Sequence, residues 1–303
     1  MDNPKTILSA SRRTDIPGCY SPWFLDGITR GQFTIINPFN RQSRIVDVTP
    51  QAVHTIVFWS KHIGPFLDLN LDRILTDRGY HLFFNLTVNA TTPLLEPGIP
   101  NLKIRLAQIA RLCRTIDPSQ ISWRFDPICF YRVNGESATN MFDFEHISAY
   151  LSDLGIRRCI TSFYDPYKKV NQRIRRLAMA GKPQIEFTDP DTSVKKEVIQ
   201  KMAGQLAEKG VQLYLCCEAE LLDALGLQKN IASGACIDGR LYKRLFGGTP
   251  ETAKDYGQRR QQGCQCTRSV DIGSYAHHPC YHNCLFCYAR TENDLPARKP
   301  GHQ

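Results

Sequence analysis

Short runs of apolar residues alternate along the chain with segments in which apolar residues recur every three to four positions. Most of the short runs are almost continuously apolar, which is typical of strands that are covered on both faces of a sheet. The segments between them have the periodicity of amphipathic helices. Eight strands are predicted in this way: Thr6–Ala10, Phe33–Asn37, Thr55–Trp59, Leu82–Val88, Ile121–Phe125, Arg158–Phe163, Gln184–Phe187 and Val211–Cys216.

The clearest helical segments are Leu102–Ile116, Phe144–Leu154, Lys168–Ala180 and Ser193–Lys209. Strands that alternate with helices indicate βαβ units, and hence a parallel sheet of the α/β class. Eight such units in about 225 residues predict a (β/α)₈ barrel like that of triosephosphate isomerase, a TIM-like barrel. An open, doubly wound parallel sheet is the alternative fold.

The pattern changes near Gly247–Pro250, beyond which both periodicities are lost and Gln, Gly, Cys and His become frequent. We therefore expect residues 1–246 to form the barrel. Residues 247–303 are expected to form an irregular, Cys-rich extension that packs on the barrel and binds metal.

The composition of the 303-residue chain, with 42% hydrophobic and 22% charged residues, excludes a mainly disordered protein. No apolar run approaches the roughly 20 residues that span a bilayer, so we expect no membrane partner. The polar start of the chain, Met1–Thr6, lacks the apolar region of a secretory signal. A cytoplasmic location is therefore expected.

The formal net charge is +9, which weakly favours an anionic ligand or nucleic acid. Much of the excess lies in one helical segment that contains Lys168, Lys169, Arg173, Arg175 and Arg176. These cations fit either a solvated helix face or a track for phosphates.

Charged residues follow several of the predicted strands, at the end where parallel barrels carry their chemistry. They are Arg12, Arg13, Asp15, Lys61, Arg124, Asp126 and Asp165. We expect these seven residues to be catalytic or to contact a small substrate or cofactor. The structural alternative is that Asp15 caps the next helix and that Arg124 and Asp126 form an ordinary ion pair.

The chain has twelve cysteines, and in a reducing compartment clustered cysteines point to metal or redox chemistry rather than disulfides. Cys280, Cys284 and Cys287 have the spacing C-x₃-C-x₂-C, which allows three thiolates to reach three irons of one cubane cluster. The fourth iron then has no local cysteine and offers an open, reactive position. Two alternatives stay open: a zinc site completed by a histidine (His277, His278 or His282), and a cluster with a distant fourth cysteine.

A second set of cysteines consists of Cys236, Cys264, Cys266 and either Cys216 or Cys217. Four thiolates could provide all four ligands of a second [4Fe-4S] cluster, which would relay electrons or stabilise the fold. A Cys₄ zinc site and ordinary buried thiols are the alternatives. Spacing alone does not choose between Cys216 and Cys217.

The C-x₃-C-x₂-C motif with the aromatic Phe286 before its third cysteine resembles the signature of radical S-adenosylmethionine (SAM) enzymes. The resemblance implies a [4Fe-4S] cluster with three Cys ligands whose open iron chelates the amino and carboxylate groups of SAM. Electron transfer from a donor such as ferredoxin or flavodoxin would then cleave the sulfonium to a 5′-deoxyadenosyl radical. Phe286 and Tyr288 could contact the adenine. In such enzymes the motif normally follows the first strand and is joined by a Gly-Gly-Glu-like element, and neither feature is found here.

The chain as a whole resembles a bacterial family described as domain of unknown function 1848. The residues that carry the resemblance are Ile7–Pro17, Asn37–Asn40, Val57–Lys61, Trp123–Pro127, Cys236–Asp238, Gln258–Cys266, Ser269–Tyr275 and the three-cysteine loop. In that pattern a C-x-E element falls on Cys216 and Glu218, which favours Cys216 as the ligand.

Two functions therefore remain open on the sequence. The leading hypothesis is an iron–sulfur enzyme of radical SAM type that modifies an unknown substrate. The alternative is a nucleic-acid-associated protein in which structural or redox-sensing iron–sulfur or zinc sites support binding to phosphates.

Overall fold

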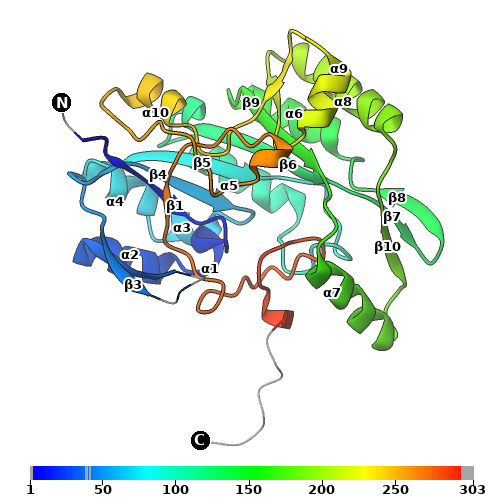
Figure 1. Cartoon of the computed structure of the whole chain (residues 1–303), viewed down its shortest axis with the longest axis horizontal. Coiled ribbons are helices and arrows are strands. Elements are labelled where there is room, and N and C mark those ends of the chain that lie inside the picture. Colours follow the sequence, from blue (N-terminus) through cyan, green and yellow to red (C-terminus); the bar gives the residue numbers. More distant parts are fainter. Residues whose placement is uncertain (1–2, 38–39, 41, 295–303) are drawn as a thin grey trace, which may run out of the picture.

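The computed structural model describes residues 3–37, 40 and 42–294, and the last residues of the predicted extension lie outside this part. Its centre is a parallel sheet with helices packed around it (Figure 1). The order of the eight strands is β12–β11–β9–β6–β5–β4–β1–β13. The sheet confirms the α/β class.

Six of the predicted strands lie in this sheet: Thr6–Ala10 (β1), Val53–Ser60 (β4), His81–Thr87 (β5), Ile121–Ile128 (β6), Arg158–Phe163 (β9) and Gln212–Leu215 (β11). All of their mutual pairings are parallel. Seven of the eight residues of β4 are buried, because helices cover one side of the sheet and the tail and α10 cover the other. Continuous apolar runs were therefore a good guide to these strands.

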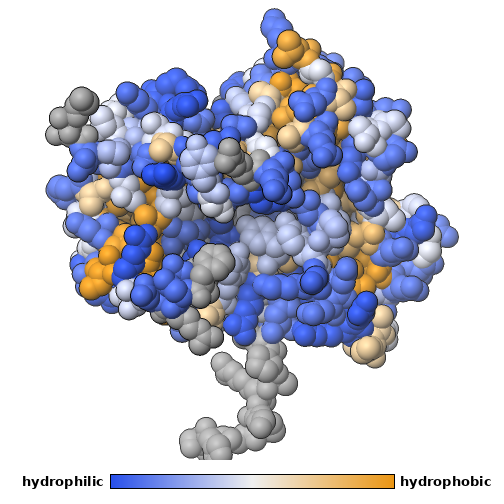
Figure 2. All heavy atoms as spheres, in the orientation of Figure 1, coloured by the Kyte–Doolittle hydropathy of each residue, from blue (hydrophilic) through white to orange (hydrophobic). Residues whose placement is uncertain are grey.

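The two other predicted strands lie outside the main sheet. Gln32–Ile36 (β2) pairs antiparallel with Ser43–Asp47 (β3) in a hairpin. Ile185–Thr188 (β10) joins an antiparallel sheet with Phe130–Val133 (β7) and Glu136–Thr139 (β8). Only Phe33 is fully buried in β2, and Figure 2 shows hydrophobic surface over this hairpin. The prediction that these two segments belong to a barrel is wrong.

Two short strands complete the main sheet, Ile231–Ser233 (β12) and Val270–Asp271 (β13). From β1 to β12 the strands follow one another around the sheet in chain order, without the reversal of a doubly wound sheet. β13 then returns beside β1, where an eighth barrel strand would stand. Within the described residues no pairing joins β12 to β13, so the structure does not show a closed barrel.

The helices of the described residues are Ile16–Cys19 (α1), Ser21–Arg30 (α2), Gly64–Asp68 (α3), Leu71–Asp77 (α4), Leu102–Leu112 (α5), Phe144–Asp153 (α6), Lys168–Met179 (α7), Thr192–Ala207 (α8), Ala219–Leu225 (α9) and Gly239–Phe246 (α10). Four of the helices, α5 to α8, correspond to the four predicted helical segments, with ends that differ by at most four residues. Local capping fixes several of their starts. The side chains of Asn101 and Asp191, for example, accept from backbone N–H groups in the first turns of α5 and α8.

The segment beyond α10 packs back onto the sheet instead of forming a core of its own. Figure 1 shows this tail, coloured orange to red, running from the side of β1 to α7. It contributes β13 to the sheet, and Asp271 on β13 accepts hydrogen bonds from Ser9 and from the backbone N–H of Arg12. The tail is thereby held across the carboxyl ends of the strands.

Candidate metal centres at the carboxyl edge of the sheet

The loop from Cys280 to Cys287 lies where the carboxyl ends of the strands meet. Leu285 N–H donates to Leu95 O at 2.7 Å, and Gly98 N–H donates to His282 O at 3.0 Å. Residues 95–98 follow β5, so these two bonds fix the loop over the carboxyl edge of the sheet. The loop therefore lies at the same end of the sheet as the charged residues that follow the strands.

Arg173 of α7 holds the same loop from the opposite side. Its guanidinium donates to the carbonyl groups of Cys284, Cys287 and Ala289, and it forms an ion pair with Asp294. Its side chain is buried. Arg173 is therefore a support for the cysteine loop, and neither a solvated cation nor part of a phosphate track.

Asp15 connects the first strand to this loop. Its carboxylate accepts from Gly18 N–H at 2.7 Å and so caps α1, as the structural alternative had it. It also accepts from Lys61 N–H, and it forms a 2.7 Å ion pair with His282 Nε2. Burial opposes protonation of His282, but the carboxylate of Asp15 raises the His282 pKa to about 9. With so many partners Asp15 is a positioning residue.

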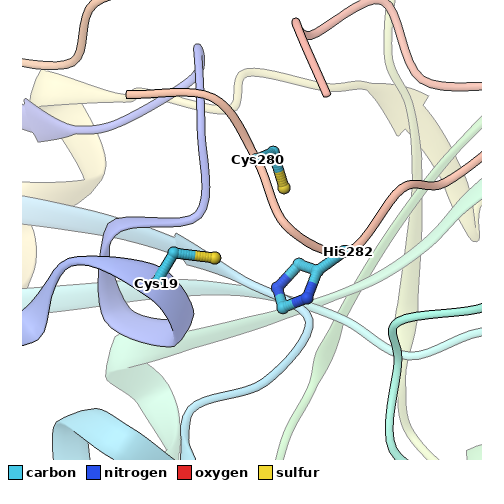
Figure 3. Close-up of side chains that lie close together, drawn as sticks. All are labelled: Cys19, Cys280 and His282. Carbon is cyan, nitrogen blue, oxygen red and sulfur yellow. The ribbon is translucent and has the colours of Figure 1, made fainter. Parts of the chain in front are cut away.

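Cys19, Cys280 and His282 form a compact group of possible metal ligands at the end of α1 (Figure 3). One ligand atom from each lies within 4.8 Å of the others. The hydrogen bond from Cys19, followed by the charge of His282, lowers the pKa of Cys280 to about 6. Cys280 is thus the thiol of the loop that most readily becomes a thiolate.

Cys284 is buried and Cys287 is half-buried, and both pack among the apolar side chains of Leu95, Leu285 and Phe286. Burial raises the pKa of Cys287 to about 11 and moves that of Cys284 well above its usual range. Such thiols stay protonated in the absence of metal, and binding of a metal ion would displace their protons into solvent.

A buried ion pair stands beside Cys284. Lys61 Nζ lies 2.6 Å from Glu96 Oε1, and the same oxygen is 3.9 Å from Cys284 Sγ. The ammonium of Lys61 also lies 5.4 Å from the centre of the Phe286 ring. Lys61 therefore balances the negative charge of Glu96 next to the cysteine loop.

The two aromatic residues expected at an adenine differ in accessibility. Phe286 is only 5% exposed and packs in the core that contains Leu95 and Ile185. Tyr288 is 42% exposed, and its hydroxyl donates to Arg12 O at 2.8 Å. Of the two, Tyr288 offers the more accessible surface to a planar ligand.

The second set of cysteines forms a ring of five thiols in mutual contact. Cys216 Sγ lies 3.2 Å from Cys236 Sγ and 3.9 Å from Cys217 Sγ. The remaining contacts run from Cys236 to Cys266, from Cys266 to Cys264 and from Cys264 to Cys217. The contacts with Cys216 and Cys264 lower the pKa of Cys217 to about 4. Both candidates, Cys216 and Cys217, thus belong to the ring.

Cationic and aromatic groups surround this ring. Arg124 Nη1 donates to Cys236 Sγ at 2.8 Å, while Arg124 Nη2 is paired with Asp126 at 2.7 Å. The guanidinium groups of Arg124 and Arg12 lie 5.3 and 5.8 Å from the Trp59 ring, which itself packs against the cysteines. Three of the residues expected to contact substrate therefore lie around the ring of five thiols: Arg12, Arg124 and Asp126.

The other expected contacts are dispersed. Arg13 donates to Gly273 O at 2.8 Å and belongs to the packing of the tail. Asp165 pairs with Arg259 at the rim, where both side chains are more than one third exposed. The structure thus divides the expected site: Asp15 and Lys61 lie near the Cys280–Cys287 loop, and Arg12, Arg124 and Asp126 lie near the ring.

Several residues of the site were missed in the sequence. Cys19 looks isolated there, although it lies just after the first strand, at the end of the sheet to which the tail returns. Glu96 lies in a loop without periodicity, and Arg173 is one cation among several in its helix. None of the three carries a local signal, because their contacts join segments that are far apart in the chain.

A family model described as domain of unknown function (DUF1848) matches residues 7–289. The chain belongs to this family. No curated protein and no solved structure matches the chain. The match covers both cysteine sets, so the DUF1848 family model spans the two candidate centres described above.

No helix in the described residues of this DUF1848 protein is long and apolar enough to cross a bilayer.

Proposed function

We propose that this protein is an iron–sulfur enzyme of radical SAM type, with Cys280, Cys284 and Cys287 as the ligands of a [4Fe-4S] cluster. The observation that supports this most directly is the placement of the three-cysteine loop at the carboxyl edge of a parallel sheet. That edge is where α/β proteins bind ligands and perform their chemistry.

The residues present fit such a cluster. Three closely spaced thiols are the soft donors that iron–sulfur clusters require. The ion pairs of Lys61 with Glu96 and of His282 with Asp15 keep these two carboxylates from adding net negative charge beside the thiolates. When bound, the cluster would supply one electron for reductive cleavage of SAM, with ferredoxin or flavodoxin as the external donor.

The protein's own residues then have identifiable tasks. Arg173 and the backbone of Gly98 fix the loop that carries the three thiols. The apolar side chains of Leu95, Leu285 and Phe286 exclude water around Cys284 and Cys287. The exposed face of Tyr288 can contact the adenine of SAM. Substrate would bind between the loop and the Arg12–Arg124 group.

A closed site is the competing arrangement at the same loop. The sequence left a histidine-completed zinc site and a four-cysteine cluster open as alternatives. Cys19 and His282, which both lie beside Cys280, are the residues that would complete them. A closed site would leave no coordination position for SAM.

The test is anaerobic reconstitution of the full chain with iron and sulfide, followed by dithionite and SAM. We expect 5′-deoxyadenosine from the wild type and none from Cys284→Ala, which also loses cluster iron. Cys113→Ala is the matched control, because Cys113 caps α5 away from both cysteine sets and should keep both properties. A wild type that binds iron at the loop but never cleaves SAM would contradict the proposal.

A second candidate concerns the substrate. Four cations of α7, Lys168, Lys169, Arg175 and Arg176, are exposed on the helix whose buried Arg173 holds the cysteine loop. A basic surface beside the loop favours a polyanion such as nucleic acid. A nucleic-acid-associated role is therefore kept as the alternative function.

A further inference from the structure

We propose that the ring of five thiols binds a second iron–sulfur cluster, a [4Fe-4S] cubane in which every iron has a cysteine ligand. Cys236, Cys264 and Cys266 supply three of these ligands, and one of the neighbours Cys216 and Cys217 supplies the fourth. The inference goes beyond the proposed function, because a cluster with four cysteine ligands has no open iron at which SAM could bind.

The first argument is the width of the ring. Around one tetrahedral ion with metal–sulfur bonds of about 2.3 Å, every pair of sulfur atoms lies about 3.8 Å apart. Neighbours in the ring approach this closely, since Cys216 Sγ lies 3.2 Å from Cys236 Sγ and 3.9 Å from Cys217 Sγ. Within the described residues, however, no three of the ring thiols have sulfur atoms that all lie within 4.8 Å of one another. The ring is therefore too wide for a single zinc ion.

A cubane cluster needs ligands that are spread in this way. It binds each thiolate to a different iron, so its thiolates stand farther apart than those around one ion. The short separations between neighbours in the ring are hydrogen bonds between thiols that still carry protons. Metal binding displaces these protons and removes the bonds, so that neighbouring side chains can turn toward different irons.

The second argument is a pair of buried donors that no ring thiol satisfies. Arg12 Nη2 and Trp59 Nε1 are buried, and neither has a hydrogen-bond partner within the described residues. Trp59 packs against the thiols, and the Arg12 guanidinium lies 5.8 Å from the centre of its ring. A zinc ion would bring no hydrogen-bond acceptor to this place. The inorganic sulfides of a cubane would, and hydrogen bonds to cluster sulfur atoms are a regular feature of iron–sulfur sites.

The third argument separates the ring from ordinary buried thiols. Arg124 Nη1 donates to Cys236 Sγ at 2.8 Å, while its other terminal nitrogen is held by Asp126 at 2.7 Å. This contact becomes a charge-assisted hydrogen bond once Cys236 is a metal-bound thiolate. Cys113 and Cys159, by contrast, pack with the main apolar core, as small hydrophobic residues do.

The position of the ring agrees with a bound cofactor. Its thiols come from three segments that are far apart in the sequence: one follows β11, one follows β12 and one precedes β13. The ring thus lies at the carboxyl edge of the sheet, where α/β proteins bind their ligands. A cluster bound here would join the tail to the ends of two strands.

The experiment counts iron and acid-labile sulfide in a loop variant, Cys280→Ala/Cys284→Ala/Cys287→Ala, which lacks the ligands of the proposed catalytic cluster. After anaerobic reconstitution of the full chain, we expect about four irons and four sulfides per chain. After reduction with dithionite, its electron paramagnetic resonance (EPR) signal should not change when SAM is added, because no iron has an open position.

Matched pairs of substitutions then locate this iron. Adding Cys236→Ala/Cys266→Ala to the loop variant should lower its iron content at least fivefold. Adding Cys113→Ala/Cys159→Ala, which removes two buried thiols outside the ring, should leave the iron content unchanged.

A reciprocal variant guards against a loop variant that fails to fold. The wild type should hold about eight irons per chain, and Cys236→Ala/Cys266→Ala with an intact loop should keep about four. A wild type that holds only about four irons, all of them retained in this reciprocal variant, would overturn the proposal.

The proposal is also overturned if the folded loop variant holds zinc or no metal in place of iron and sulfide, or if SAM alters its EPR signal. Failure of the wild type to cleave SAM, with the iron of the loop variant retained, would count against the proposed function alone.

Discussion

The Glu96 carboxylate is only 3% exposed and lies next to the Cys284 thiol. Its ion pair with Lys61 stabilises it in this buried position. A buried carboxylate without a partner is costly, and a second negative charge on Cys284 would add repulsion. The ammonium of Lys61 balances the carboxylate. Because Lys61 neutralises Glu96, the Cys284 thiol can lose its proton when metal binds without facing an unbalanced carboxylate.

Replacing Lys61 alone should therefore destabilise the protein strongly. Lys61→Met leaves the Glu96 charge buried and unpaired, and we expect the free energy of unfolding to fall by about 3–5 kcal/mol. The double variant Lys61→Met/Glu96→Gln removes both charges and should recover most of this loss. Urea denaturation of the three proteins measures the effect. Equal stability of the single and double variants would contradict the role given to the pair.

Cys19 distinguishes an open cluster from a closed one. If the cluster has only the three ligands of the loop, Cys19→Ala should keep its iron and still cleave SAM. If Cys19 completes the site, the same variant should lose iron or gain a cleavage activity that the wild type lacks. Iron content and 5′-deoxyadenosine yield, measured on the same preparations, decide between the two arrangements.

The residues of the candidate site were predictable to very different degrees. Cys280, Cys284 and Cys287 have ligand spacing within one loop, and that local signal was sufficient to identify them. The contacts of Cys19 with Cys280 and of Glu96 with Lys61 form only when distant segments meet in the fold. Phe286 has the motif position of a ligand contact, yet it is buried in the core.

At the scale of elements, Gly98 sets how closely the cysteine loop approaches the end of β5. A Cβ atom on Gly98 would lie 2.7 Å from both Tyr281 O and His282 O, and backbone atoms cannot move aside cheaply. Gly98→Ala should therefore displace the loop, with a cost of about 1–3 kcal/mol in stability and a loss of cluster iron.

The matched control is Gly204→Ala in α8, where a Cβ atom meets nothing within 4 Å. It should keep its iron and gain up to about 1 kcal/mol in stability, because alanine favours the helix. Iron analysis and thermal unfolding of both variants test the prediction. An unchanged iron content in Gly98→Ala would show that the loop can shift without consequence.

The strands were predicted well where a long apolar run in the sequence became a buried strand of the main sheet. The continuous apolar runs of β1, β4, β5, β6, β9 and β11 mark a covered parallel sheet. Similar runs in β2 and β10 belong to antiparallel pairs, because periodicity does not reveal which strand a segment will pair with. The three residues of β12 and the two of β13 are too few to give any pattern.

At the scale of the whole molecule, the net charge of +9 bears on the choice of substrate. If the exposed cations of α7 bind phosphates, affinity for a single-stranded oligonucleotide should fall steeply with salt. The slope of log K against log[salt] should be about −3 for four phosphate contacts. Lys168→Ala/Arg175→Ala should reduce the magnitude of this slope by about 1.4.

The control is Lys201→Ala/Lys243→Ala, which removes two exposed cations from α8 and α10 and leaves the net charge equal to that of the test variant. Fluorescence anisotropy across a salt series provides the measurement. If both double variants lose affinity equally, the binding reflects net charge and not a surface on α7. If the wild type shows no binding at low salt, the polyanion candidate fails.

The pairing of β1 with β13 has a consequence for how the chain is made. Ser9 and its partner Asp271 are separated by 262 residues, so the first strand leaves the ribosome long before its neighbour exists. At about 5–20 residues per second this interval is about 13–50 s. During that time the outer edge of β1, with Ile7 and Leu8, has no partner from its own chain, and an unpaired edge invites association with other nascent chains. Productive folding of this protein therefore depends on keeping its first strand shielded until the tail has been translated.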